Sequence, residues 1–495
     1  MTIGVNNLQT DAYRDEEEER IIKQAAWEVS NLVKARVGSI SDFQEADREF
    51  TRAVMEEDKA PRHVLNPVTF NRGLFYQRLK RGEIGFHILW VVGDYEKAEQ
   101  SFLKINKGGR PLSEWETAVV ENRHSSFMRT VMSLTSVSST KHYWHTKDLA
   151  EGTQEATKKK TEEIISGIEK LHEILFKPTY ETPIRRLQQP LFVAPDIQTR
   201  SQWLSQLLTV VEGGKGREGE TRKLIERDKN ALPEEIINNG WELVDDTLDA
   251  FSHLVGPSPK SLAVVPTLYF YTDAGRYVRS LLYGLLYWLL SGSEENVLNR
   301  KRVLSIHRAA FEQILLDNKE DVVTGITRKT GSGHEITSQT AQYYQGLLEL
   351  LIQHKDDVQS TAFSADYSAL AKRLTNKASK VRISLGRSRL FTPNQKSALI
   401  LDNFFYNPNR CGICDGILDP TADLQHDHIL EHAKGGKTLP ENQRLVHPFC
   451  NNPANREIIL AGKSGIESIK LPRFIDPDLA TEPRQLELFD DPYFA

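Results

Sequence analysis

The sequence predicts a predominantly helical, multidomain α+β chain that ends in a small zinc-stapled unit. Three observations lead to this prediction. Apolar residues recur at helical spacing along much of the 495-residue chain. The clearest strand-like run is short, from Gly85 to Val92, and glycine and aspartate bound it. All three cysteines fall between positions 411 and 450.

Composition is that of a globular protein with 39% hydrophobic and 26% charged residues. The net charge of -5 means that any nucleic-acid surface must be a local patch. The first twenty residues are polar and acidic, so we expect no signal peptide. The most apolar helix, Tyr277 to Leu290, is too short to cross a membrane. Cysteines that can all be assigned to zinc favour a reducing cytoplasm.

Residues 1–145 are expected to form a first region, with helices at Glu16–Val37 and Asp42–Met55. Ser113 and Glu116 have the spacing of a capping box, which predicts a helix beginning there. Between these elements, Asn106 to Leu112 reads Asn-Lys-Gly-Gly-Arg-Pro-Leu.

This phrase resembles the Asn-x-x-Gly-x-Pro-Leu motif of the GmrSD-type, ParB-like domains of prokaryotic modification-dependent restriction systems. The Asp-Gly-Gln-Gln-Arg-type signature linked to nucleotide binding and hydrolysis in that family is absent. The resemblance therefore implies a truncated domain, no nucleotide hydrolysis by this chain alone, and a partner chain that supplies the missing nucleotide-binding motif. The alternative is an ordinary glycine-rich turn between helices.

Residues 146–365 are expected to be a helical middle region without a catalytic constellation, serving to scaffold, sense or recognise. The expected helices are Thr153–Phe176, Thr221–Lys229, Pro233–Leu254, Ala274–Leu290, Asn296–Asp317 and Ser338–Lys355.

Residues 366–470 are expected to hold a basic approach segment followed by the zinc-stapled unit. Tyr367 to Leu401 contains no acidic residue. Its basic residues are Lys372, Arg373, Lys377, Lys380, Arg382, Arg387, Arg389 and Lys396. A cluster of this kind in an acidic protein predicts contacts with DNA phosphates. The alternative is a solvated helix face and loop.

Two pairs of ligands, each with two residues between its members, predict the structural zinc site. The four ligands are Cys411, Cys414, His447 and Cys450, a combination that suits tetrahedral Zn2+. Cysteines alone would equally fit a zinc ribbon that binds nucleic acid without cutting it.

The segment between and around these ligands resembles the HNH nucleases, whose catalytic unit is a ββα-metal fold. Asp427-His428-Ile429 is similar to the Asp-His-Ile of that family. Gly435-Gly436, Asn442 and Cys450-Asn451 follow in the family's order. The resemblance covers roughly a tenth of the chain. His447 departs from it, because a fourth cysteine is more usual at this position.

The resemblance implies metal-dependent hydrolysis of DNA phosphodiester bonds, in prokaryotic restriction or antiphage defence. His428 would be the general base, and Asp427 and Asn451 would bind Mg2+ or Mn2+. Asn442 would hold the loop and orient the His428 ring. His426 and Asn455 are weaker candidates for further ligands. Two alternatives remain open: a nuclease of DNA repair or mobile-element processing, and a zinc-stabilised DNA-binding protein that does not cut.

Residues 471–495 are expected to be an extended tail. Gln485, Leu486, Leu488 and Phe489 lie within Gln-Leu-Glu-Leu-Phe. This phrase resembles the short peptide by which bacterial replication and repair proteins dock onto the sliding clamp. The alternative is that these apolar side chains pack on their own domain.

Overall fold

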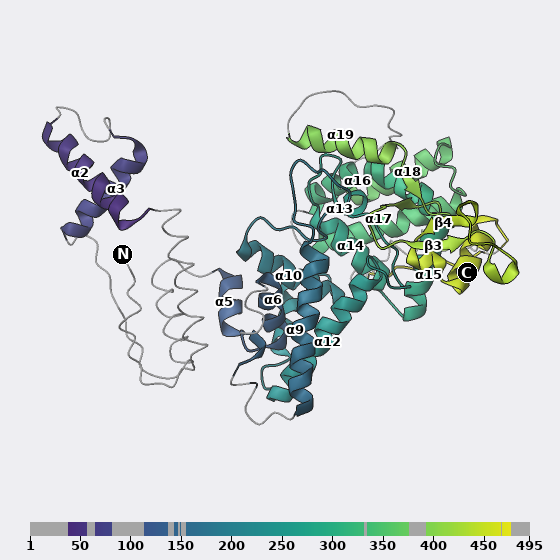
Figure 1. The fold of residues 1–495 in the computed structure, drawn as a ribbon, viewed down its shortest axis with the longest axis horizontal. Coiled ribbons are helices and arrows are strands. Elements are labelled where there is room, and N and C mark those ends of the chain that lie inside the picture. Colours follow the sequence, from purple (N-terminus) through teal and green to yellow (C-terminus); the bar gives the residue numbers. More distant parts are fainter. Residues whose placement is uncertain are drawn as a thin grey trace. The chain divides into compact units, whose positions relative to one another are not determined.

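The structure, a computed structural model, describes residues 38–56, 65–81, 113–136, 143–146, 149, 155–330, 334–375, 393–466 and 468–476. The chain separates into two compact units, Met1–Gly109 and Arg110–Ala495 (Figure 1). Several predicted features lie outside the described residues. They are the Glu16–Val37 helix, the Gly85–Val92 strand, the Asn106–Leu112 motif, Lys377, Lys380, Arg382, Arg387, Arg389, Gln485, Leu486, Leu488 and Phe489.

The described part of the first unit is a pair of helices, α2 (Ile40–Glu56) and α3 (Pro67–Lys80). Aromatic contacts join them, with the ring centroids of Phe43 and Phe75 5.8 Å apart. Asp47 accepts a 2.6 Å hydrogen bond from Lys80 Nζ. The predicted Asp42–Met55 helix is confirmed.

The second unit is predominantly helical, as predicted. Its first helices are α5 (Glu114–Glu121), α6 (Ser126–Thr135), α9 (Glu155–Phe176), α10 (Ile197–Val211), α11 (Glu218–Glu226) and α12 (Pro233–Ser252). The next are α13 (Pro266–Phe270), α14 (Arg279–Leu290), α15 (Glu294–Ile306), α16 (Arg308–Thr330), α17 (His334–Gln353), α18 (Thr361–Thr375) and α19 (Pro393–Tyr406). The capping box of Ser113 and Glu116 opens α5.

Helix α14 is the buried centre of this body. Nine consecutive residues, Leu281 to Leu289, are buried along it, which explains its apolar sequence. It packs against α17, where Gly284 faces Thr340 and Ala341. Among the described residues, no helix is both long enough and apolar enough to cross a membrane.

The single helix expected at Asn296–Asp317 is wrong, because α15 ends at Ile306 and α16 begins at Arg308. His307 stands between them, and its Nδ1 lies 2.9 Å from Asp356 Oδ1. Helical periodicity continued across the break, so apolar spacing alone could not reveal it.

Two small antiparallel sheets follow the helices. Strands β1 (Asn409–Arg410) and β2 (Ile417–Leu418) form one sheet, and β3 (Gln425–His428) and β4 (Gln443–Val446) form the other. Between β3 and β4 lie two short 3-10 helices, η4 (His432–Lys434) and η5 (Pro440–Asn442). Two helices, α20 (Pro448–Asn451) and α21 (Pro453–Lys463), come after β4.

These strands and helices are fastened to the helical body rather than attached through one linker. Phe449 N–H donates to the carbonyl of Ser261, and α21 packs against α15. After α21 the chain returns to the helical body, where Phe474 meets Tyr287 edge-on with ring centroids 5.4 Å apart. Asp476 is buried there and pairs with Lys215 and Ser338.

The close packing of α14 on α17 yields a stability prediction. A Cβ added at Gly284 would lie 2.6 Å from Thr340 Cβ, so Gly284→Ala forces the helices apart. We expect the free energy of unfolding to fall by about 1–3 kcal/mol, measured by urea denaturation. Gly219→Ala in α11 is the matched control, since nothing lies within 4 Å of its Cβ. An unchanged or raised stability of Gly284→Ala would contradict this packing.

Candidate metal centre

Two turns bring the predicted zinc ligands together. Cys411 and Cys414 lie in the loop that joins β1 to β2, where Cys411 N–H donates to the carbonyl of Gly416. Asp415 adopts φ 60, which turns the chain back toward β2. His447 is the N-cap residue of α20, and Cys450 lies within that helix.

The four side chains form one buried cluster. Their ligand atoms all lie within 4.8 Å of one another. His447 Nδ1 lies 3.3 Å from Cys414 Sγ, while its Nε2 lies 3.2 Å from the carbonyl of Ile417. The carbonyl can only accept, so Nε2 carries the proton and Nδ1 is the nitrogen available to a metal. The cluster thus offers three sulfur atoms and one nitrogen, a set that suits zinc.

The thiols of the cluster influence one another's ionisation. Hydrogen bonds from Cys414 and Cys450 hold the pKa of the Cys411 thiol far below its usual value. Burial raises the pKa of Cys414, and the hydrogen bond with Cys411 raises the pKa of Cys450. A bound cation would allow all three sulfurs to be thiolates.

A buried ion pair of the helical body lies against this cluster. Arg308 Nε donates to Glu312 Oε1 at 2.7 Å, and neither side chain is exposed. Arg308 Nη1 also donates to the carbonyl of Leu262 at 2.7 Å and lies 3.2 Å from His447 Nδ1. Glu312 accepts from the Tyr269 hydroxyl at 2.9 Å. The second Glu312 oxygen accepts from the backbone N–H of Ile417 at 2.5 Å.

The predicted catalytic residues lie on and beside the β3–β4 hairpin. Asp427 faces Arg444 across the sheet and accepts hydrogen bonds at Oδ2 from its Nε (2.8 Å) and Nη2 (2.7 Å). Arg456 on α21 lies 3.2 Å from Asp427 Oδ1. Both carboxylate oxygens of Asp427 therefore have guanidinium partners.

His428 follows Asp427 on the strand, so the two side chains leave opposite faces of the sheet. His428 Nε2 lies 3.2 Å from the Thr438 hydroxyl, in an exposed loop rather than in apolar packing. His426, a weaker candidate for a metal ligand on the same strand, lies against Gln443.

Asn442 holds the loop between β3 and β4. Its Oδ1 accepts from Leu430 N–H at 2.7 Å, and its Nδ2 donates to the carbonyls of Leu430 and Lys437 at 2.9 Å. The loop also needs its two glycines. Gly435 has φ 89, and a Cβ on Gly436 would lie 1.8 Å from the carbonyl oxygen of Leu430.

Asn451 lies on the Asp427 side of the hairpin. Its Nδ2 donates to Gln425 Oε1 at 2.8 Å, and Gln425 stands two residues before Asp427 on the same face of β3. The Oδ1 of Asn451 is thus the oxygen that it can offer to a cation. Asn455 is buried and accepts from Arg302 Nε at 3.1 Å, so it serves the contact with α15.

Sequence reasoning missed Arg444, Arg456 and Thr438. A signal for Arg444 existed: the antiparallel pairing of the Asp427 strand with Gln443–Val446 places it opposite Asp427. Of the predicted DNA-contacting residues in the described part of the chain, Lys372 and Arg373 are exposed in the last turn of α18, and Lys396 is exposed on α19.

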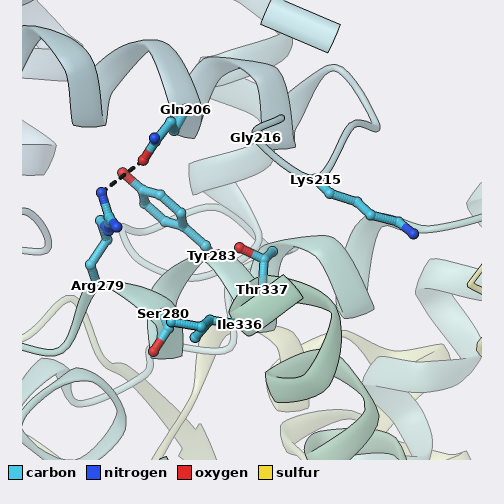
Figure 2. A pocket seen from close by; sticks show the side chains of 8 residues that line it. All are labelled: Gln206, Lys215, Gly216, Arg279, Ser280, Tyr283, Ile336 and Thr337. Carbon is cyan, nitrogen blue, oxygen red and sulfur yellow. Dashed lines mark hydrogen bonds between the residues drawn. The ribbon is translucent and has the colours of Figure 1, made fainter. Parts of the chain in front are cut away.

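A separate hollow in the helical body does not add a ligand site. Figure 2 shows its lining, with Arg279 and Tyr283 close together and the Lys215 side chain pointing away from them. Arg279 Nη1 donates to Gln206 Oε1 at 2.7 Å. The accessible space is about 20 Å³, which accommodates a water molecule and nothing larger.

Comparison of this chain with known protein families, with characterised proteins and with solved structures finds no match. The site therefore has to be interpreted from its own geometry and chemistry.

The buried cluster yields a metal prediction. We expect about one zinc per chain in the purified protein. The Cys411→Ser variant should lose this zinc and should no longer show a cooperative unfolding transition. Elemental analysis gives the zinc content, and thermal denaturation gives the folding. Asp427→Asn is the control, because Asp427 is not part of the cluster, and it should retain zinc. A stable zinc-free parent protein would contradict the assignment.

Proposed function

We propose that this chain is a metal-dependent DNA endonuclease of the HNH type, which hydrolyses phosphodiester bonds. One observation carries the proposal. A single antiparallel hairpin and the helices after it carry His428, Asp427, Asn442 and Asn451 beside a buried cysteine–histidine cluster. The setting in prokaryotic restriction or antiphage defence follows from the family resemblance alone.

The residues present fit a hard divalent cation such as Mg2+ or Mn2+. Asp427 supplies carboxylate oxygens and Asn451 an amide oxygen, the donors that such ions prefer. The two lie on the same face of β3, since Asn451 contacts Gln425 there. Such a cation would neutralise charge on the phosphate and lower the pKa of a bound water.

The chain's own groups would carry the remaining steps. In this proposal His428 accepts the proton of the attacking water, and the Thr438 hydroxyl at its Nε2 fixes the direction of the ring. Asn442 keeps the loop that bears Thr438 closed through its contacts with Leu430 and Lys437. Exposed Lys372 and Arg373 are proposed to bind the DNA backbone.

A second candidate function is a zinc-stabilised DNA-binding protein that does not cut. Two observations favour it: both oxygens of Asp427 already have arginine partners, and the side chains of Asp427 and His428 leave opposite faces of β3. The two functions differ in the fate of the DNA, which one experiment resolves.

We expect the purified protein to nick or cut plasmid DNA in the presence of Mg2+. His428→Ala should lower the rate about 100-fold or more, because the general base is lost. His432→Ala is the matched control: this exposed histidine lies in the same loop, and its loss should leave the rate unchanged. Equal cutting by His428→Ala and the parent would refute the assigned base, and DNA binding without any cutting would favour the second function.

A further inference from the structure

Asp427 has two arginine partners, Arg444 and Arg456, and its contacts with Arg444 are shorter and more numerous. Arg444 binds Oδ2 through two nitrogens at 2.8 and 2.7 Å. A third bond from its Nη1 reaches the carbonyl of Gly412 at 2.9 Å, and its stem covers Gly412 closely. Arg444 is therefore fixed between β3 and the loop that holds Cys411.

Arg456 is held much less firmly. One nitrogen, Nη1, makes both of its ion pairs, at 3.2 Å to Asp427 Oδ1 and at 3.6 Å to Glu431 Oε1. A single long contact is weaker than a forked one, because hydrogen-bond strength falls with distance and misalignment. Of the two arginines, Arg456 is thus the one that can leave Asp427.

The local charges favour the release of Arg456 from Asp427 when a cation binds. Asp427, Arg444 and Arg456 are only 10, 17 and 15% exposed, so water screens their charges poorly. Two carboxylates, Asp427 and Glu431, face two guanidinium groups and the ammonium group of Lys434 in this arrangement. A divalent cation at Asp427 would add two positive charges and would compete with Arg456 for the same oxygen.

We propose that Arg456 is a latch on Asp427, which releases the carboxylate to a divalent cation and then binds the phosphate of the DNA. This inference rests on the proposed nuclease function. Guanidinium groups bind phosphate through paired hydrogen bonds, and the released side chain remains beside the cation that the same phosphate would contact. Arg456 thus couples binding of the cation to binding of the substrate.

The latch predicts opposite effects on two measurements. In zinc-loaded full-length protein without DNA, Arg456→Gln should tighten Mn2+ binding by about threefold to tenfold, because the competing ion pair is gone. Mn2+ binding is followed by the electron paramagnetic resonance signal of the free ion. At saturating Mn2+, the same variant should cut plasmid DNA at least about tenfold more slowly, because a phosphate contact is lost.

Lys434→Ala is the matched control. Lys434 Nζ pairs with Glu431 Oε2 at 3.1 Å, so its removal deletes one positive charge from the same cluster without removing a partner of Asp427. It should change Mn2+ affinity by less than Arg456→Gln. Arg456→Lys, which keeps the charge but not the fork, should restore the Mn2+ affinity toward that of the parent without restoring the rate. Thermal denaturation confirms that each variant is folded.

The outcomes separate the latch from the proposed function. Unchanged or weaker Mn2+ binding by folded Arg456→Gln overturns the latch, even if the parent cuts DNA. Tighter Mn2+ binding with an unchanged cutting rate overturns the contact with phosphate. If Asp427→Ala binds Mn2+ as well as the parent, the assignment of Asp427 as a metal ligand fails, and the nuclease proposal is weakened with it.

Discussion

The buried ion pair of Arg308 and Glu312 is the interaction on which the arrangement of the carboxyl-terminal part depends. Both charges are fully buried, and removal of either would leave the other without compensation. Glu312 accepts from the backbone of Ile417, and Arg308 reaches His447. The helical body thus orients both the loop of the first cysteines and the histidine of the cluster.

This coupling gives the helices a role in the site that goes beyond support. Arg308 begins α16 directly after the break at His307, so the interruption between α15 and α16 places the guanidinium at the cluster. Lys301 Nζ, on α15, lies 4.4 Å from the ring centroid of Phe449, which is the residue before Cys450. A displacement of these helices would therefore shift the four residues of the cysteine–histidine cluster and the β3–β4 hairpin.

Part of the site could be predicted from sequence because the relevant constraints are local. The spacing of Cys411, Cys414, His447 and Cys450 is sufficient to predict one cluster, since each pair lies in one tight turn. The loop role of Asn442 and of the two glycines is local in the same way. Arg308, Glu312 and Arg456 could not be found, because their partners are set by packing between distant elements. Periodicity likewise predicted the helices but not the break at His307.

The return of the chain to the helical body after α21 has a consequence for engineering. Phe474 and Asp476 anchor this segment on the helical side, while Phe449 and Arg308 tie the hairpin region to the same body. The region is thus held to the helical body at both of its ends and is a poor candidate for transfer to another protein as an independent domain. Excision would expose apolar surface, remove Asp476 from Lys215 and remove the Ile417 N–H from Glu312, so fusion designs should include the surrounding helices.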